Sequence, residues 1–452
     1  MIFLDALDVS MVGVALPAIQ HDLGLSTSSL QWVVSGYVLG YGGLLLLGGR
    51  TADLLGRRRV FLVALGVFAV ASLLGGLVDD GTLLIVARFV KGVGAAFTAP
   101  AALSIITTTF PEGPERNKAL SIFTACGASG YSLGLVLSGL LTEIGWRWTL
   151  LMPVPVAIIA LIAALKVLPR GEEERAKGGH DLIGAVLITA SMLLLVFTVV
   201  QAPEAGWTSL RTIGSLVAVA ALLGLFVFAE LRMKHPLVRL GILRSGSLVR
   251  ANLGLLILMG SYVSFQFVAM QYFQNLLGWS ALGTALAFLP AGLLVAITST
   301  KMGDFADRFG TTKLTIIGAA ALAGGYAMFL GIDERPSLGG LVIPGMLLLG
   351  IAFALSFAPL NIQATNGVSD DEQGLASGLL NTSGQVGGAI VLAVVSAVLS
   401  SGGATLSIDT LRSAIVVSLV LALVGVAISA TGLRVRKPVA AAQEDPKVFE
   451  TV

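Results

Sequence analysis

Four ionisable side chains stand inside stretches of the sequence that are otherwise apolar. Asp5 and Asp8 lie three residues apart in the first apolar stretch, and Arg88 and Lys91 lie three residues apart in the fourth. Residues at i and i+3 share one face of a helix. An ionisable residue inside a membrane span costs about 2.5–3.5 kcal/mol on insertion scales, so it needs a partner or a water-filled cavity. We therefore expect the two acids to face the two cations, in a group that can bind and release protons.

Two short polar stretches, one in each half of the chain, share the pattern Gly-x-x-Ala-Asp-x-x-Gly followed by cations. Each stands between apolar stretches and so predicts a tight turn joining two membrane helices, with its cations at the cytoplasmic surface. Glycine permits close helix approach and positive φ. Asp53 and Asp307 are expected to accept hydrogen bonds from a helix N-terminus or to pair with Arg, and so to hold the helices that move during transport. An ordinary basic turn is the alternative. The residues assigned to these gating turns are Gly49, Asp53, Gly56, Arg57, Arg58, Gly303, Asp307, Arg308 and Gly310.

The composition is that of a membrane protein. Of the 452 residues 56% are hydrophobic and 12% are charged, about half the charge fraction of a soluble domain. Apolar stretches of about 20 residues recur, each long enough to cross a bilayer core. The sequence therefore predicts an all-α polytopic membrane protein. Its fourteen expected spans are 1–19, 31–48, 60–78, 82–108, 118–142, 148–168, 182–203, 211–231, 250–276, 279–299, 314–331, 338–363, 374–400 and 410–433.

The distribution of cations fixes the expected topology. Of the 28 Lys and Arg, only Arg147, Arg211, Arg335 and Arg412 fall outside when the first helix leaves the cytoplasm. Both termini are therefore expected on the cytoplasmic side of a bacterial inner membrane. Met1–Pro17 lacks a basic region and a cleavage site, so we do not expect a secretory signal. Because the sequence begins inside its first span, we expect a few cytoplasmic residues to precede it in the native protein.

Several function classes are excluded by what the sequence lacks. The cationic loops are short and scattered, which argues against a nucleic-acid surface. One cysteine excludes an internal disulfide framework, and three separated histidines form no metal-ligand cluster. Neither gating turn contains Gly-x-x-x-x-Gly-Lys-Ser/Thr, so ATP is not the expected energy source. We expect no cofactor and no metal, and a monomer that contacts protons, lipid and a small amphipathic substrate.

Internal repetition divides the chain. Besides the two turns, Glu115–Gly130 resembles Glu372–Gly387. We predict an N-terminal six-helix bundle (1–170), a cytoplasmic loop with two inserted helices (171–240), a C-terminal six-helix bundle (241–433) and a cytoplasmic tail (434–452). The helix of the second half that corresponds to the one with Arg88 reads Ile-Pro-Gly-Met-Leu from position 343, with no cation.

These motifs resemble those of the major facilitator superfamily, and within it the fourteen-helix drug:proton antiporters. The gating turns are similar to that superfamily's loop between its second and third helices. Leu7–Pro17 resembles the first-helix motif Leu-Asp-x-Thr-Ile-Val-Asn-Val-Ala-Leu-Pro, with Ser10 for Thr and Gly13 for Asn. The stretch from Arg88 is similar to Arg-x-x-Gln-Gly-x-Gly, with Lys91 for Gln. The resemblance implies two bundles that rock around a central site.

The resemblance also implies site residues. Asp8, Arg88, Asp5 and Lys91 become the proton-coupling group, although a static ion pair that sets helix packing is the alternative. Gly127–Gly139 resembles the antiporter motif, with Leu135 in place of its proline, and places Gly130, Gly134 and Gly139 where helices approach. The expected substrate-cavity residues are Trp32, Tyr37, Gln271, Gln274, Asn361, Asn381 and Gln385, with Gln266 and Gln363 as further candidates.

The function predicted from these residues is export of amphipathic or cationic drugs in exchange for protons, by alternating access. A dedicated exporter of one endogenous metabolite, antibiotic, siderophore or lipid is the alternative within transport. A membrane enzyme would need His, Asp or Ser clustered at one interface, and none is present, so we expect no enzyme. A sensor that no longer transports is the third possibility, against which the intact Asp8, Arg88 and turn aspartates argue.

Overall fold

The computed structural model describes residues 1–25, 27–168, 182–233, 240–299, 301–369, 372–401 and 407–434. Within these ranges the chain is helical and contains no β-strand, as the sequence predicts. Residues 169–181, 234–239 and the tail beyond 434 lie outside the described ranges. The domain boundaries near 170, 240 and 434 therefore stay predictions.

Seven helices make up the first bundle, here called the N half. They are α1 (Ile2–Leu23), α2 (Thr27–Leu55), α3 (Arg57–Leu77), α4 (Gly81–Thr109), α5 (Pro114–Ile144), α6 (Arg147–Leu151) and α7 (Pro153–Val167). The inserted hairpin consists of α8 (Leu182–Ala205) and α9 (Leu210–Glu230).

The second bundle, here called the C half, begins with a short 3₁₀ turn at Leu240–Arg244 and contains two π-helical turns, Gln271–Leu276 and Leu338–Val342. Its α-helices are α10 (Gly246–Met270), α11 (Ala281–Ser299), α12 (Met302–Phe309), α13 (Thr311–Phe329), α14 (Ile343–Thr365), α15 (Gln373–Ser401) and α16 (Ile408–Thr431). A last 3₁₀ turn covers Gly432–Arg434.

Polar and small residues set where these helices begin. The Asp80 carboxylate accepts from the Leu83 N–H at 2.8 Å and caps α4, and Ser245 and Ser407 cap α10 and α16 in the same way. The two gating turns end at Gly56 and Gly310, whose φ angles are 96° and 82°. Only glycine adopts such angles without strain, so these residues allow the chain to reverse within one residue.

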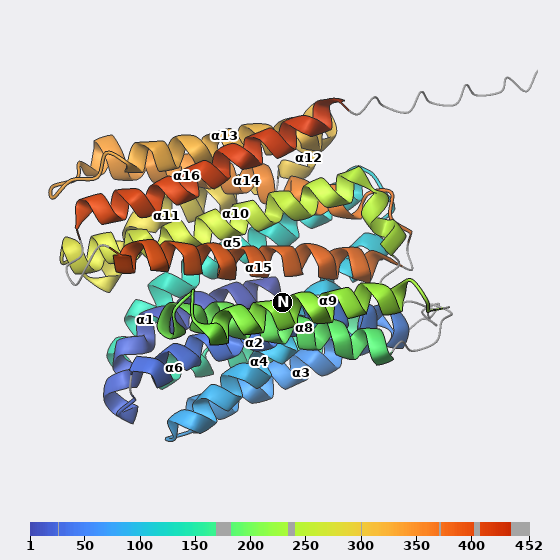
Figure 1. The fold of residues 1–452 in the computed structure, drawn as a ribbon, viewed down its shortest axis with the longest axis horizontal. Helices are drawn as coiled ribbons and strands as arrows, with labels where there is room; N and C mark the ends of the chain where they lie inside the picture. Colours follow the sequence, from blue (N-terminus) through green and yellow to red (C-terminus); the bar gives the residue numbers. More distant parts are fainter. Residues whose placement is uncertain are drawn as a thin grey trace, which may run out of the picture.

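The helices form two bundles that lie side by side (Figure 1). In the N half α1 packs on α5, and α4 lies between α2 and α3; in the C half α10 packs on α15, and α13 lies between α14 and α16. The halves meet where α5 contacts α11 and α12, and where α15 contacts α2 and α4. The four predicted charged residues lie on α1 and α4, so the candidate functional site is described along these two helices and at the contact between the halves.

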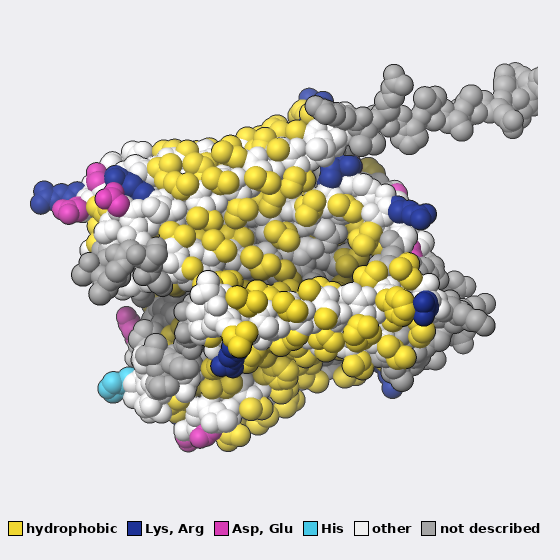
Figure 2. Space-filling view, viewed as in Figure 1, with side chains coloured by type: hydrophobic (Ala, Val, Ile, Leu, Met, Phe, Trp, Pro, Cys, Tyr) yellow, Lys and Arg dark blue, Asp and Glu magenta, His cyan; other side chains and the backbone are white. Residues whose placement is uncertain are grey.

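The surface is that of a membrane-spanning protein. The face in Figure 2 carries a broad apolar area over the middle of the helices, with most of its charged side chains near the two ends. Among the described residues, eleven helices are long and apolar enough to cross a membrane, or twelve when α11 and α12, bent by 68° between them, form one span. Helices occupy all fourteen predicted ranges, but the described parts of α1 and α8 are not among the eleven, so fourteen spans stay a prediction.

The inserted hairpin lies along the boundary between the halves. Its first helix, α8, contacts both α2 of the N half and α15 of the C half. The Phe197 ring on α8 lies 5.7 Å from the Trp32 ring on α2, and Leu193 lies directly against Gly43. In Figure 1 the green hairpin crosses the front of the N half beside α15. It covers the α2–α15 contact from outside.

Candidate functional site

Helix α1 is held against α5 by small residues. A Cβ on Gly130 would overlap the Phe3 carbonyl oxygen, and one on Gly134 would stand 2.7 Å from that of Leu7. Ser138 adds a hydrogen bond from its Oγ to the Met11 carbonyl oxygen at 2.6 Å. This is the close approach for which small residues are selected in membrane helices. Gly139, predicted to belong to the same surface, has no described atom within 4 Å of a built Cβ.

At the centre of the N half, Asp8 is bound by both cations of α4. Its Oδ2 accepts from Nη1 of Arg88, and its Oδ1 accepts from Nζ of Lys91 at 2.5 Å. The Asp8 side chain is 0% exposed, and the two cations are 3% and 1% exposed. The predicted meeting of acid and cations is therefore present at Asp8, and both of its oxygens are occupied.

The two cations have further partners, which fix their positions. Arg88 donates from Nε to the Val33 carbonyl oxygen at 3.0 Å, and its guanidinium lies 4.7 Å from the centre of the Tyr37 ring. Lys91 donates to Ser72 Oγ at 2.5 Å. The group therefore joins α1, α2, α3 and α4. Buried charges are stable only with such complete pairing.

Asp5 departs from the predicted arrangement. Its side chain is buried, with 5% of the residue exposed, and neither carboxyl oxygen has a hydrogen-bond partner among the described residues. We expected both acids to pair with cations, but Asp8 alone contacts them. Both cations turn toward the Asp8 carboxylate, one to each oxygen. Tyr37, predicted to line the cavity, is also buried there with an unbonded hydroxyl.

At the end of the bundle that carries the gating turns, glycine lets the halves touch twice. A Cβ on Gly49 of α2 would overlap the Gly374 carbonyl oxygen of α15. A Cβ on Gly303 of α12 would lie 2.8 Å from the Asn117 carbonyl carbon of α5. Each gating turn thus begins with a glycine that contacts the opposite half. The repeat that relates Glu115–Gly130 to Glu372–Gly387 also relates Asn117 to Gly374, so the two contacts are equivalent.

Polar contacts reinforce one of these two junctions. Asn117 donates from Nδ2 to Asp307 Oδ1, so Asp307 binds a residue of the other half. Its partner is a side-chain amide and not the arginine or helix N-terminus that we expected. The Gly367 N–H donates to Glu112 Oε1 at 2.7 Å. Gly374 has no side chain with which to offer Asp53 the same bond. Asp53 lies on α2, and its side chain is outside the described set.

The assigned cations of the gating turns are half-buried or exposed. Arg58 donates from Nη2 to the Leu165 carbonyl oxygen at 3.2 Å, within the N half, and Arg57 begins α3 beside it. The Arg308 guanidinium lies 5.2 Å from the centre of the Phe309 ring. Arg58 and Arg308 thus each have a contact within their own half, whereas Gly49, Gly303 and Asp307 contact the opposite half.

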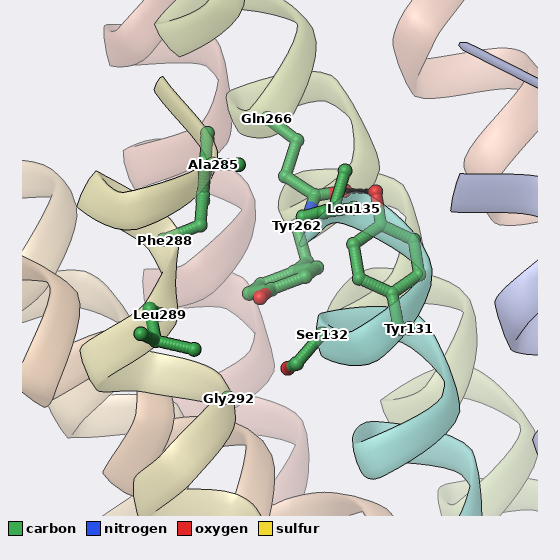
Figure 3. A pocket seen from close by; sticks show the side chains of 9 residues that line it. All are labelled: Tyr131, Ser132, Leu135, Tyr262, Gln266, Ala285, Phe288, Leu289 and Gly292. Carbon is green, nitrogen blue, oxygen red and sulfur yellow. Dashed lines mark hydrogen bonds between the residues drawn. The ribbon is translucent and has the colours of Figure 1, made fainter. Parts of the chain in front are cut away.

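A small cavity of about 20 Å³ lies between the halves (Figure 3). Tyr131 of α5 donates from its hydroxyl to Gln266 Oε1 of α10 at 2.9 Å and so joins the two halves. The lining is aromatic and apolar with a few hydroxyl and amide groups. The lining residues are Tyr131, Ser132, Leu135, Tyr262, Gln266, Ala285, Phe288, Leu289 and Gly292. Such a lining suits an amphipathic molecule.

Most of the predicted cavity residues lie elsewhere. Gln271 and Gln274 are on the π-helical turn after α10, and Gln271 accepts from Asn275 at 2.5 Å. Asn361 and Asn381 each donate to a carbonyl oxygen of their own helix at 2.8 Å. Gln385 interacts with Tyr41 across the α2–α15 boundary.

Of the residues considered from sequence, Gln266 lines the cavity. The sequence reasoning did not select Tyr131, although it lies inside the antiporter-like stretch Gly127–Gly139, which is the signal that points to it. Asn117 was also missed. The repeat gave no indication of a hydrogen bond between Asn117 and Asp307, because the residue that corresponds to Asn117 in the second half is Gly374.

Comparisons with known proteins agree on one family. The model of the Major Facilitator Superfamily matches residues 1–392. The cephamycin export protein CmcT of Amycolatopsis lactamdurans is 39% identical over 410 residues, covering 88% of this chain and 83% of the relative. The multidrug resistance protein Stp of Mycobacterium tuberculosis is 33% identical over 402 residues, covering 89% and 74%. The solved proton:xylose symporter XylE superposes with a TM-score of 0.66 at 15% identity, covering 93% and 92%, which is a likeness of fold.

Proposed function

The chain belongs to the major facilitator superfamily, and from this membership we propose that it exports amphipathic drugs from the bacterial cytoplasm in exchange for protons. It is a multi-pass membrane transporter of small molecules and not an enzyme. The proposed exchange for protons has its main support in three charged side chains of the N half, here called the charge group. Asp8, Arg88 and Lys91 are buried where four helices meet, and ionisable groups at such a depth mark ion pathways in membrane proteins.

Coupling requires that proton binding and the rocking of the halves influence each other. The charge group lies on α1 and α4, and its neighbour Tyr37 lies on α2, which contacts α15 of the C half. A change of charge in the group alters the electric field at this boundary. We infer that the protonated and deprotonated forms favour different arrangements of the two halves.

The contacts at the gating turns are consistent with a transporter closed on its cytoplasmic side. Gly49 and Gly303 bring the backbones of the two halves together, and Asp307 and Glu112 bond across the same end. Opening toward the cytoplasm would separate these contacts together. The Tyr131–Gln266 hydrogen bond beside the cavity would open in the same movement.

The substrate class follows from the cavity. Its aromatic rings and few polar groups offer large apolar contact areas with little fixed directionality, and aromatic faces also attract cations. The cavity of about 20 Å³ has room for about one water molecule and is far smaller than the range of about 300–1,000 Å³ for drug-sized ligands. The cavity would therefore have to widen when the halves separate to admit a planar amphipathic cation.

The test is movement of ethidium in proteoliposomes that contain the purified protein. An imposed pH gradient should drive ethidium against its concentration gradient in the native protein, and an ionophore that collapses the pH gradient should stop it. Asp8→Asn should abolish the driven movement, whereas Asp409→Asn, which removes an exposed carboxyl of the C half, should not. Equal driven transport by native protein and Asp8→Asn would contradict the role of the charge group.

A dedicated exporter of one endogenous compound is the second candidate. It is favoured by the name of the relative CmcT, a cephamycin export protein, whereas Stp is named for multidrug resistance. Expression in a drug-sensitive bacterium separates the two. Resistance to several unrelated amphipathic compounds supports multidrug export, and resistance to one or none supports the dedicated exporter.

A further inference from the structure

The two carboxyl groups of α1 have opposite surroundings although they are one helical turn apart. Each oxygen of Asp8 is bound by a different cation. Neither oxygen of Asp5 has a hydrogen-bond partner among the described residues, yet the residue is 5% exposed. A buried polar atom without a partner is rare in folded proteins and calls for an explanation. The different surroundings of Asp5 and Asp8 therefore suggest that the two acids have different roles in the proton coupling proposed above.

Resting on that proposed function, we propose that Asp5 carries the proton exchanged for substrate and that Asp8 is the permanent counter-ion of Arg88 and Lys91. Protonating Asp8 would leave two buried cations without their acceptor, which is the costly way to break a buried ion pair. Protonating Asp5 breaks no contact. The carboxyl that can change its charge at little structural cost is therefore Asp5.

The charges around Asp5 favour neither form strongly. The charged side chains that act on it are Asp8 on α1 and Lys91 on α4, and the hydroxyl groups of Tyr37 and Tyr41 on α2 lie within its electrostatic reach. Helix α5 presents small residues toward this part of α1, Gly127 and Gly130. Burial without hydrogen bonds favours the neutral acid, whereas one uncompensated positive charge among Asp8, Arg88 and Lys91 favours the carboxylate. A small movement of α1 against α4 can then decide between them.

Tyr41 connects this carboxyl to the other half. The Asp5 carboxylate acts electrostatically on the Tyr41 hydroxyl, which also has a hydrogen bond with the side chain of Gln385 of α15. The neighbouring Gly42 also lies against Gln385, whose Cβ would be 3.6 Å from a Cβ built on Gly42. Rocking of the C half therefore changes the surroundings of Asp5 through one side chain. In one arrangement the Asp5 carboxylate takes a proton from outer water, and in the other its O–H bond breaks and the proton passes to cytoplasmic water.

Infrared spectroscopy tests this division without knowledge of the substrate. A protonated buried carboxyl has a C=O stretching band distinct from that of a carboxylate, and this band should appear and disappear as the pH of proteoliposomes with the full chain is changed. We expect the band in native protein and in the control Asp409→Asn, and its loss in Asp5→Asn. Asp5→Asn should fold normally because Asp5 holds no partner. Persistence of the titrating band in Asp5→Asn would overturn the proposal.

Transport by the same proteoliposomes separates failure of this inference from failure of the proposed function. With ethidium as the probe, gradient-driven movement should be lost in Asp5→Asn and regained in part in Asp5→Glu, which restores a carboxyl. Driven movement in native protein that survives in Asp5→Asn would refute the assignment of Asp5. No driven movement in native protein, with a band that still depends on Asp5, would support Asp5 as a proton site and refute coupled export of the cation.

Discussion

The same place in the two duplicated bundles is filled by charges in one and by aromatic rings in the other. In the N half, α1, α3 and α4 meet at the group in which Asp8 binds Arg88 and Lys91, with Ser72 beside Lys91. Each of these three buried charges needs a partner. The N half therefore contains three buried and paired charges, at the expense of desolvating each of them.

In the C half, the helices α10, α13 and α14 meet at aromatic contacts. The Phe265 ring on α10 lies 5.1 Å from the ring of Tyr326 and 4.8 Å from that of Phe329 on α13. Phe329 in turn packs on Gly345 of α14, the position without a cation. Apolar packing holds this half together without buried ion pairs among these helices, so the fold itself does not require the charge group. The difference supports a functional reason for its presence in the N half.

The largest expected effect comes from unpairing the charges. Asp8→Ala leaves Arg88 and Lys91 buried without their acceptor and should lower the free energy of unfolding by about 3–5 kcal/mol. Phe265→Leu removes part of one ring from an apolar site and should cost about 1–3 kcal/mol. Thermal unfolding in detergent, followed by tryptophan fluorescence, compares the two.

Ethidium transport is the second measurement that compares the two halves. Phe265→Leu should keep pH-driven ethidium movement at temperatures below its unfolding transition, because no charge has changed. If Phe265→Leu abolished coupling while remaining folded, the two halves would share the proton-dependent role and the contrast between them would be lost.

The next largest effect concerns the gating turns, where the halves are alike. Gly49→Ala and Gly303→Ala each place a methyl group against the backbone of the opposite half. Overpacking of this kind costs about 1–3 kcal/mol and should push the halves apart at this end. Spin labels on the two halves should report a longer distance in both variants. Gly66→Ala, for which no described atom lies within 4 Å of a built Cβ, is the control and should leave the distance unchanged.

A difference between these two variants would sharpen the comparison. The Gly303 junction is reinforced by the Asn117–Asp307 bond, and the Gly49 junction faces Gly374. The bond is worth about 1–3 kcal/mol because its acceptor is a carboxylate. Gly49→Ala should therefore open the end further than Gly303→Ala. Equal opening in the two variants would mean that the hydrogen bond between Asn117 and Asp307 does not help to hold the two halves together at this end.

The smallest effect is expected at the far end of the bundles. There the N half is tied by ion pairs, since Arg147 binds Asp22 at 2.7 Å and Trp146 donates to the same carboxylate. Arg412 of the C half donates instead to the carbonyl oxygens of Leu330 and Ile332. Hydrogen bonds from Trp146 and then Arg147 lower the pKa of Asp22, which lies beyond the predicted first span 1–19.

The pKa of Asp22 is lower in the folded protein than its usual value of 3.8. Asp22 therefore stabilises the folded protein fully at pH values above 3.8, and this stabilisation disappears as the pH falls through the lower pKa of the folded state. The melting temperature of native protein should therefore approach that of Asp22→Asn as the pH is lowered below about 4. A constant difference between the two proteins at every pH would show that Asp22 acts by packing and not by charge.

Much of the fold could be predicted from the sequence because its signals are local. Apolar length predicts each span, and the structure places a helix in every predicted range. Glycine and charge in a short stretch predict each gating turn, where Gly56 and Gly310 have positive φ. The i, i+3 pairs placed Asp8 opposite Arg88 and Lys91, since four buried charges leave few alternatives.

The sequence alone could not divide the roles of Asp5 and Asp8, because spacing puts both on one face and says nothing about which one the cations reach. The position of α1 in the tertiary structure, where it is held against α5 at Gly130 and Gly134, decides which carboxyl group lies within reach of Arg88 and Lys91. The same limit applies to the cavity. Tyr131 and Gln266 are 135 residues apart, and their meeting depends on how two bundles associate, which no local pattern encodes.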